Sequence, residues 1–198
     1  QGSTGASTSA FTGYGAGYNS AGASYSAFTG YGAGQDSTGA HDSFFAGENA
    51  GKDSTGANNA LFMGVNAGYS STGANNSLFM GNHAGQSDVI NNTNSPDDFS
   101  ILIGNNSHTG GYSNSIALGG GAINTATNQF MIGSTSRPIN TTRFQGASAG
   151  TQCTITTGTG IACTSDERLK TNITDISSDA LARLASVRTV HYNLIGDT

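Results

Sequence analysis

The sequence has few charged residues, few prolines and no tryptophan. Only 10% of its 198 residues are charged, against about 25% in an average protein. Such low charge argues against a coil that charge repulsion keeps disordered, and two prolines are too few for collagen. No apolar run approaches the roughly 20 residues of a membrane-spanning helix. We therefore expect an ordered protein that does not insert into a membrane.

Positive charge is especially scarce. The chain has 7 Lys and Arg residues and a net charge of −5, and Lys52 is the first cation along it. Because electrostatic binding to nucleic acid or anionic membranes needs cations, we expect neither partner. The 4 histidines are scattered and no CxxC pair occurs, so we predict no metal site and no cofactor. The chain begins at Gln1 without methionine, and we expect a fragment or a processed product.

Glycine, in contrast, is abundant, and much of it belongs to a repeat. Residues 3–87 divide into consecutive 17-residue units without an insertion, the last being STGANNSLFMGNHAGQS (71–87). Three columns recur in every unit: phenylalanine (Phe11, Phe28, Phe45, Phe62, Phe79), glycine two residues later (Gly13, Gly30, Gly47, Gly64, Gly81), and alanine followed by glycine (Ala16, Ala33, Ala50, Ala67, Ala84). We therefore assign residues 1–87 to five regular repeats.

A looser form of the repeat continues over residues 88–145. The apolar element that ends in glycine returns as ILIG (101–104), IALG (116–119) and FMIG (130–133). The long step before ILIG contains SDVINNTNSPDD, whose proline and polar residues are typical of an excursion loop.

Each unit is expected to form one coil of a β-solenoid. Seventeen extended residues would span about 56 Å at ~3.3 Å per residue, so a compact unit must turn back on itself. Glycine permits the positive φ values that such turns require. Strand residues would surround the phenylalanine, and stacking of the coils would align identical residues in ladders. The sequence thus predicts an all-β fold built on a parallel β-solenoid over residues 3–145.

The thinness of the coils leads to a prediction about assembly. One coil offers only one or two large apolar side chains, for example Leu61 and Phe62. Stacked repeats need further burial for stability, so we predict a parallel homotrimer with Phe, Leu or Met at the threefold axis. The alternative is a monomeric β-helix, although the coils of such proteins usually carry more aliphatic residues.

Residues 146–164 predict a β-hairpin that connects the coils to the C-terminal segment. The stretch CTITTGTGIAC alternates Thr and Ile around Gly158 to Gly160, a pattern typical of a hairpin. A turn near residue 158 would place Cys153 opposite Cys163. We favour two reduced, buried cysteines, and a cross-strand disulfide is the alternative.

The repeats carry a family resemblance. Units of the type STGxNNxxFMGxxAG, followed by SNSIALGGGA and NQFMIG, resemble the shafts of phage tail fibres. They are also similar to the left-handed β-roll in the heads of trimeric autotransporter adhesins. The resemblance implies a trimeric, elongated shaft without enzymatic activity.

A second resemblance begins at SDERLKTNI (165–173). The run CTSDERLKTNITDI resembles the start of the intramolecular chaperone domain of endosialidases and other phage tail spikes, so we assign residues 165–198 to such a domain. The family's domain trimerises the fibre and then cuts itself off just before the serine. After the SDERLKTNI motif we expect a short helix through Ala180 to Val187 and a strand over VRTVHYNL (187–194).

The resemblance implies a Ser–Lys site. Ser165 would attack the carbonyl of Thr164, and Lys170 would act as the base if loss of water lowers the pKa of its amine. Three residues would support them by pairing or positioning: Asp166, Glu167 and Arg168. The alternative is a charged turn that merely opens an ordinary helical domain.

These features predict a structural protein of a phage or phage-like tail fibre that takes part in host attachment and is located in the virion. Its expected partners are its own copies, other tail or baseplate proteins, and a host surface receptor such as a glycan. The alternative is a trimeric cell-surface adhesin or extracellular filament. A glycan-cleaving enzyme is disfavoured, because no paired carboxylates fall in a plausible cleft. Five tyrosines suit either sugar stacking or solvated corners: Tyr14, Tyr18, Tyr25, Tyr31 and Tyr69.

Overall fold

The computed structural model describes residues 2–90, 99–145, 152–156 and 160–163, and after residue 142 it describes the backbone alone. The chain divides into two compact units, Gln1–Asn140 and Thr141–Thr198.

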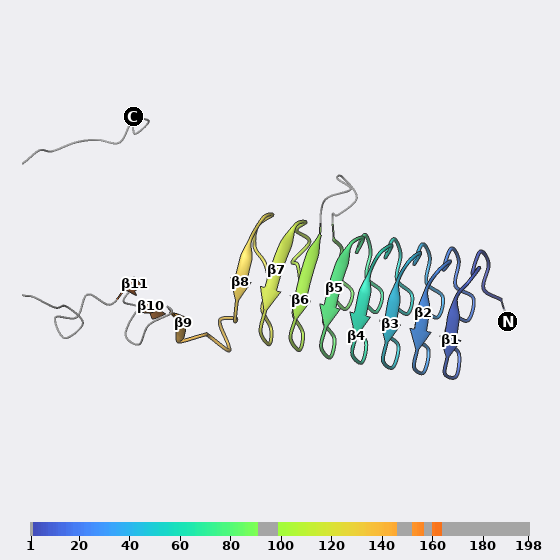
Figure 1. Ribbon diagram of the computed structural model, residues 1–198, viewed down its shortest axis with the longest axis horizontal. Coiled ribbons are helices and arrows are strands. Elements are labelled where there is room, and N and C mark those ends of the chain that lie inside the picture. Colours follow the sequence, from blue (N-terminus) through green and yellow to red (C-terminus); the bar gives the residue numbers. More distant parts are fainter. Residues whose placement is uncertain (1, 91–98, 146–151, 157–159, 164–198) are drawn as a thin grey trace, which may run out of the picture. The chain divides into compact units, whose positions relative to one another are not determined.

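The first unit is a parallel β-solenoid, as the repeat predicted. Its strands form one parallel sheet in the order β1 to β8, so that each strand pairs only with its neighbours in the sequence (Figure 1). The strands are β1 (Ala10–Thr12), β2 (Ala27–Thr29), β3 (Phe44–Ala46), β4 (Leu61–Met63), β5 (Ser77–Met80), β6 (Ser100–Ile103), β7 (Ser115–Leu118) and β8 (Phe130–Ile132). The described part of this unit contains no helix.

The register follows the repeat. Phe11 pairs with Phe28, and Phe45 with Phe62, so equivalent residues lie side by side in successive coils. The longer step between β5 and β6 does not disturb this alignment, because Phe79 pairs with Leu102. An insertion between two strands leaves their pairing intact when it is confined to the connecting segment. Repeat spacing therefore predicted strand partners correctly, including across the interruption.

The phenylalanine column lies inside the coils of a single chain. Phe28, Phe45, Phe62 and Phe79 are 0% exposed, and the rings of Phe45 and Phe62 stack with centroids 4.7 Å apart and planes 6° apart. The predicted stacking is confirmed. The prediction that these phenylalanines lie at a threefold axis is wrong, because a side chain fully enclosed by its own coil cannot contact another copy.

Small residues explain why one phenylalanine fills a coil. Ala50 and Ala67 are fully buried beside the rings, and a Cβ atom added to Gly51 would overlap the ring of Phe45. The backbone of the opposite wall of the coil therefore packs directly against the ring, with no side chain between them. A thin coil closes around a single large side chain because its walls carry almost no side-chain volume.

Buried serine hydroxyls link the interior to the backbone. The Ser43 hydroxyl donates to the carbonyl of Ala57 at 2.5 Å and accepts from the amide of Ala60 at 3.0 Å, both in the next coil. In a second column, Ser20, Ser37 and Ser54 donate within their own coil, the last of them to the carbonyl of Gly51 at 2.7 Å. Because buried polar groups need partners, these hydroxyls satisfy carbonyls and amides that the short strands leave unpaired.

The second unit contains a three-stranded antiparallel sheet in the order β11, β10, β9. Its strands are β9 (Thr141–Gln145), β10 (Gln152–Thr156) and β11 (Gly160–Cys163). Cys153 pairs with Cys163 in the register, which confirms the predicted hairpin. The expected coil structure of residues 141–145 is wrong, because β9 pairs antiparallel with β10. TTRFQ is followed by a glycine, as the coil strands are, but it pairs antiparallel with the next strand along the chain instead of parallel with the preceding coil. The expected C-terminal helix and strand lie outside the described residues.

Candidate functional site

The predicted self-cleavage residues lie outside the described part of the chain. This applies to the bond between Thr164 and Ser165, to Lys170, and to the supporting residues Asp166, Glu167 and Arg168. The structure places one element beside them, since β11 ends at Cys163. The bond that the Ser–Lys hypothesis selects therefore follows directly after a β-strand. The catalytic roles of these residues stay a prediction.

The outer face of the solenoid sheet carries two uncharged columns. Side chains alternate between the two faces of a strand, so the residues that flank each inward phenylalanine point outward. The first column is Ala10, Ala27, Phe44, Leu61, Leu78, Ile101, Ile116 and Phe130, and the second is Thr12, Thr29, Ala46, Met63, Met80, Ile103, Leu118 and Ile132. We call these sixteen residues the outer apolar face.

The outer apolar face is accessible in the single chain. Phe44 and Ile103 are each 41% exposed, and Phe130 is 58% exposed. From β3 onward every position holds an apolar residue, and all except Ala46 are large. The six strands from β3 to β8, separated by about 4.8 Å, make this strip about 24 Å long. Continuous exposed apolar strips of this kind are typical of interaction surfaces.

Of the Phe, Leu and Met residues expected to face other chains, the repeated phenylalanines are enclosed, whereas Leu61 and Met63 lie on the outer apolar face. The sequence carried a signal for this division. LFM, ILI and FMI each hold three apolar residues in a row. Because successive residues of a strand face opposite sides, such a run makes both faces apolar. One face was therefore bound to lie outside the coil, and the flanking residues occupy it rather than the phenylalanines.

Tyrosines gather at one corner of the first two coils. Tyr14 and Tyr31 are 80% and 57% exposed, and Tyr18 is 52% exposed. The rings of Tyr14 and Tyr31 stack with centroids 5.4 Å apart and planes 12° apart. Tyr14, Gly15, Tyr18 and Gln35 line a hollow of about 360 Å³. We call Tyr14, Gly15, Tyr18, Tyr31 and Gln35 the tyrosine corner.

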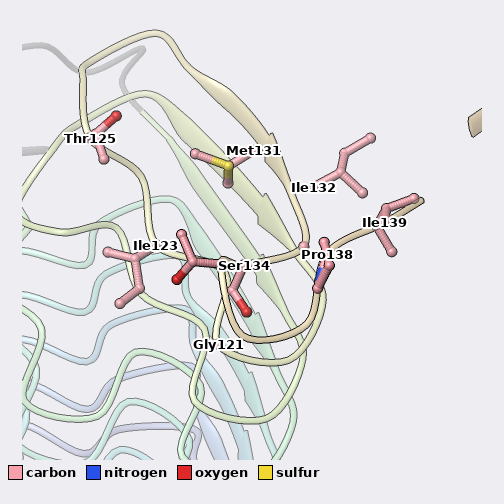
Figure 2. A pocket seen from close by; sticks show the side chains of 10 residues that line it. Gly121, Ile123, Thr125, Met131, Ile132, Ser134, Pro138 and Ile139 are labelled. Carbon is pink, nitrogen blue, oxygen red and sulfur yellow. The ribbon is translucent and has the colours of Figure 1, made fainter. Parts of the chain in front are cut away.

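A second hollow lies at the last coils of the solenoid unit. It has a volume of about 480 Å³. Figure 2 shows Ile123 and Thr125 on one side, Met131 and Ile132 from β8, and Pro138 and Ile139 from the segment that follows. None of the lining residues is ionisable. The hollow is therefore suited to apolar contact rather than to acid–base chemistry.

One buried acid, Asp88, has a structural partner. Its Oδ2 accepts the backbone N–H of Thr109 at 2.5 Å and lies 3.9 Å from Nδ1 of His108. In the described residues no other buried side chain is charged. Asp88 therefore ties two coils together.

Across residues 2–90 and 99–142, no three His, Cys, Asp or Glu side chains are grouped in a way that could hold a metal ion. Among the described residues there is no helix with the length and apolar character of a membrane span.

Comparison with known proteins identifies the C-terminal segment. Residues 165–198 match the family model described as chaperone of endosialidase. No curated protein matches the chain, and no solved structure does. The match starts at Ser165, where the sequence motif predicted it. Residues 165–198 therefore belong to an endosialidase-type chaperone domain, and the residues before them form a parallel β-solenoid and a three-stranded antiparallel sheet.

Proposed function

We propose that the chain is part of the trimeric fibre shaft of a phage or phage-like tail that attaches to a host. An endosialidase-type chaperone domain together with a repetitive β-solenoid fits such a shaft. The observation that carries the proposal is the outer apolar face. Tail or baseplate proteins and a host surface receptor are its further partners, and the virion is its location.

The outer apolar face supports association with copies of the same chain. Met63, Ile103 and Ile132 keep more than a third of their surface exposed. Full burial of a large apolar side chain contributes about 1.5–3 kcal/mol, so covering several of them would exceed the cost of association. A threefold axis along the stack brings identical residues of three chains to the same height. A chaperone domain at the same end of every chain requires the chains to run parallel.

A charge on this face tests the assembly. Ile103→Asp should convert the trimer to monomers, because three carboxylates would meet in one layer without water. Since the Ile103 side chain is 41% exposed in the single chain, the variant should keep its β-type circular dichroism. Light scattering coupled to size exclusion gives the mass. Thr72→Asp is the control, because Thr72 is exposed outside the outer apolar face.

Persistence of the trimer in both Ile103→Asp and Met63→Asp would remove the outer apolar face from the interface. A monomer in the parent protein would contradict the trimeric shaft itself.

We also propose that the chaperone domain is released by self-cleavage. The Ser165 hydroxyl adds to the carbonyl carbon of Thr164, and its proton passes to the neutral amine of Lys170. The amide C–N bond then breaks, an ester to Ser165 forms, and the amine of Ser165 takes up the proton. Water hydrolyses the ester and leaves Thr164 with a free carboxylate. The support is the matched family and the presence of Ser165 and Lys170 within it.

A further inference from the structure

The geometry points to a saccharide-binding site at the tyrosine corner. We propose that Tyr14, Tyr18, Tyr31 and Gln35 bind a neutral saccharide chain. The inference rests on the proposed function in one respect, since an attachment fibre must contact a surface. It adds the place of contact and the chemical class of the ligand.

The corner is hollowed and its side chains face solvent. The hollow of about 360 Å³ lies between Tyr14 and Tyr18, with Gln35 of the next coil on its border. Gly15 also lines it, and a Cβ added there would lie 3.7 Å from Oε1 of Gln35. Because this residue has no side chain, the hollow is open down to the backbone at this point. A sugar ring is of a size that such a volume accepts.

The tyrosines are not needed for the fold of the corner. The column that holds Tyr14 and Tyr31 continues as Glu48, Val65 and Asn82 in later coils. The same backbone hydrogen bond nevertheless recurs in later coils. The Gly32 N–H donates to the carbonyl of Tyr14 at 2.9 Å, and the Asn66 N–H donates to the carbonyl of Glu48 at 2.8 Å. Coils thus form equally well with a charged or aliphatic residue in this position. The aromatic residues in the first two coils call for an explanation outside the fold.

The chemistry of the corner selects a neutral, hydroxyl-rich ligand. A tyrosine ring offers an apolar surface and one hydroxyl, and the Gln35 amide offers a donor and an acceptor. Sugar rings present C–H groups that stack on aromatic rings and hydroxyls that bond to phenols and amides. No Lys or Arg occurs before Lys52, so the first two coils supply no cation for a sulfated or carboxylated chain. Neutral saccharides are therefore the class that fits.

Binding can be followed through tyrosine fluorescence, because the chain has no tryptophan. The probes are maltohexaose, cellohexaose and hexa-N-acetylchitohexaose, each titrated into the parent protein. We expect at least one to give a saturable change. Tyr31→Val and Tyr18→Gln should each weaken binding about 10-fold or more, equivalent to about 1.4 kcal/mol. Both replacements already occur in the same columns, as Val65 and Gln86, so the coils should keep their fold.

A matched control uses the same substitution elsewhere. Tyr69 occupies the column of Tyr18, but in a coil where Val65 replaces the corner tyrosine. Tyr69→Gln should leave the affinity within about twofold of the parent, a free-energy change of about 0.4 kcal/mol. An equal loss in Tyr69→Gln and Tyr18→Gln would overturn the location of the site. Stronger binding of hexagalacturonate, an acidic probe, would overturn the neutral class.

The outcome is separable from that of the shaft proposal. Absence of a saturable change with all three neutral probes, in a protein that light scattering shows to be trimeric, overturns the saccharide site alone. Saturable binding by a protein that light scattering shows to be monomeric supports the site and contradicts the trimer.

Discussion

At the residue scale, a column of glycines sets how closely the coils stack. Gly47 has a φ of 134°, and a Cβ added to it would lie 2.5 Å from the carbonyl oxygen of Gly64 in the next coil. Because this oxygen belongs to the backbone of the next coil, it cannot move away from the added Cβ as the end of a flexible side chain could. Gly39 also has a positive φ, 71°, but its added Cβ would come no closer than 3.7 Å to Gly56.

Substitution of Gly39 therefore tests backbone strain alone, whereas substitution of Gly47 tests backbone strain together with steric overlap between coils. Gly39→Ala should cost about 1–2 kcal/mol, the penalty of a side chain in the left-handed region. Gly47→Ala should cost at least ~3 kcal/mol, because strain in an essentially glycine-only region adds to the clash between coils. Denaturant unfolding of both variants measures the difference. Equal costs would show that the coils can separate at Gly47 without loss.

A tyrosine in the left-handed region makes a stabilising substitution available. Tyr25 has a φ of 57°, whereas Asn59 and Asn76 occupy the same column in later coils. Asparagine tolerates this conformation better than a bulky residue does. Tyr25→Asn should therefore raise the free energy of unfolding by up to ~1 kcal/mol. The gain is reduced by the energy of the edge contact between the Tyr25 and His41 rings, which the substitution removes.

Thermal unfolding of Tyr25→Asn measures the gain. Tyr69→Asn is the control, since Tyr69 does not have a positive φ and should gain nothing. A lower midpoint for Tyr25→Asn than for Tyr69→Asn would contradict the strain argument.

At the scale of the strand, adjacent residues have different roles. Phe62 in β4 is fully enclosed by its own coil, while Met63 is 37% exposed. Phe62→Ala should lower stability by about 3–5 kcal/mol, as truncation of a buried phenylalanine does. The loss should not depend on assembly, because the cavity forms inside each chain.

Measurements at two protein concentrations test this independence. If Phe62→Ala loses the same free energy of unfolding relative to the parent at both, the defect lies within the coil. If the loss in free energy of unfolding is markedly smaller at high protein concentration, the phenylalanine column contributes to the interface between chains.

At the scale of the whole molecule, the chaperone segment predicts a change of covalent structure after assembly. Lys170 can lose its proton readily only where folding removes water and fixes its distance to Ser165. The protein expressed from its complete gene should give a fragment that begins with Ser165 and a shaft that ends at Thr164. Ser165→Ala and Lys170→Ala should each give only uncut chains on denaturing gels.

N-terminal sequencing of the released fragment identifies the bond. Efficient cutting in Ser165→Ala would remove the proposed nucleophile. An intact parent protein would indicate that the domain remains in place as a permanent cap.

The sequence by itself determined the register of the solenoid. Recurrence of phenylalanine and glycine every 17 residues in residues 3–87 predicted which strands pair, and Phe11 to Phe79 stack accordingly. A fixed spacing has this power because parallel coils align equivalent residues. The SDERLKTNI motif likewise identified the chaperone segment, which the family model matches from Ser165 onward.

Only the tertiary structure decided which apolar residues lie inside. In LFM, alternation requires Leu61 and Met63 to share one face and Phe62 to take the other, but three apolar residues do not show which face is enclosed. The width of the coil decides it, since walls of alanine and glycine leave room for one ring. Likewise, TTRFQ could extend another coil by composition alone. Thr141–Gln145 instead pairs antiparallel with β10, the next strand along the chain, and the composition of the segment does not reveal this pairing.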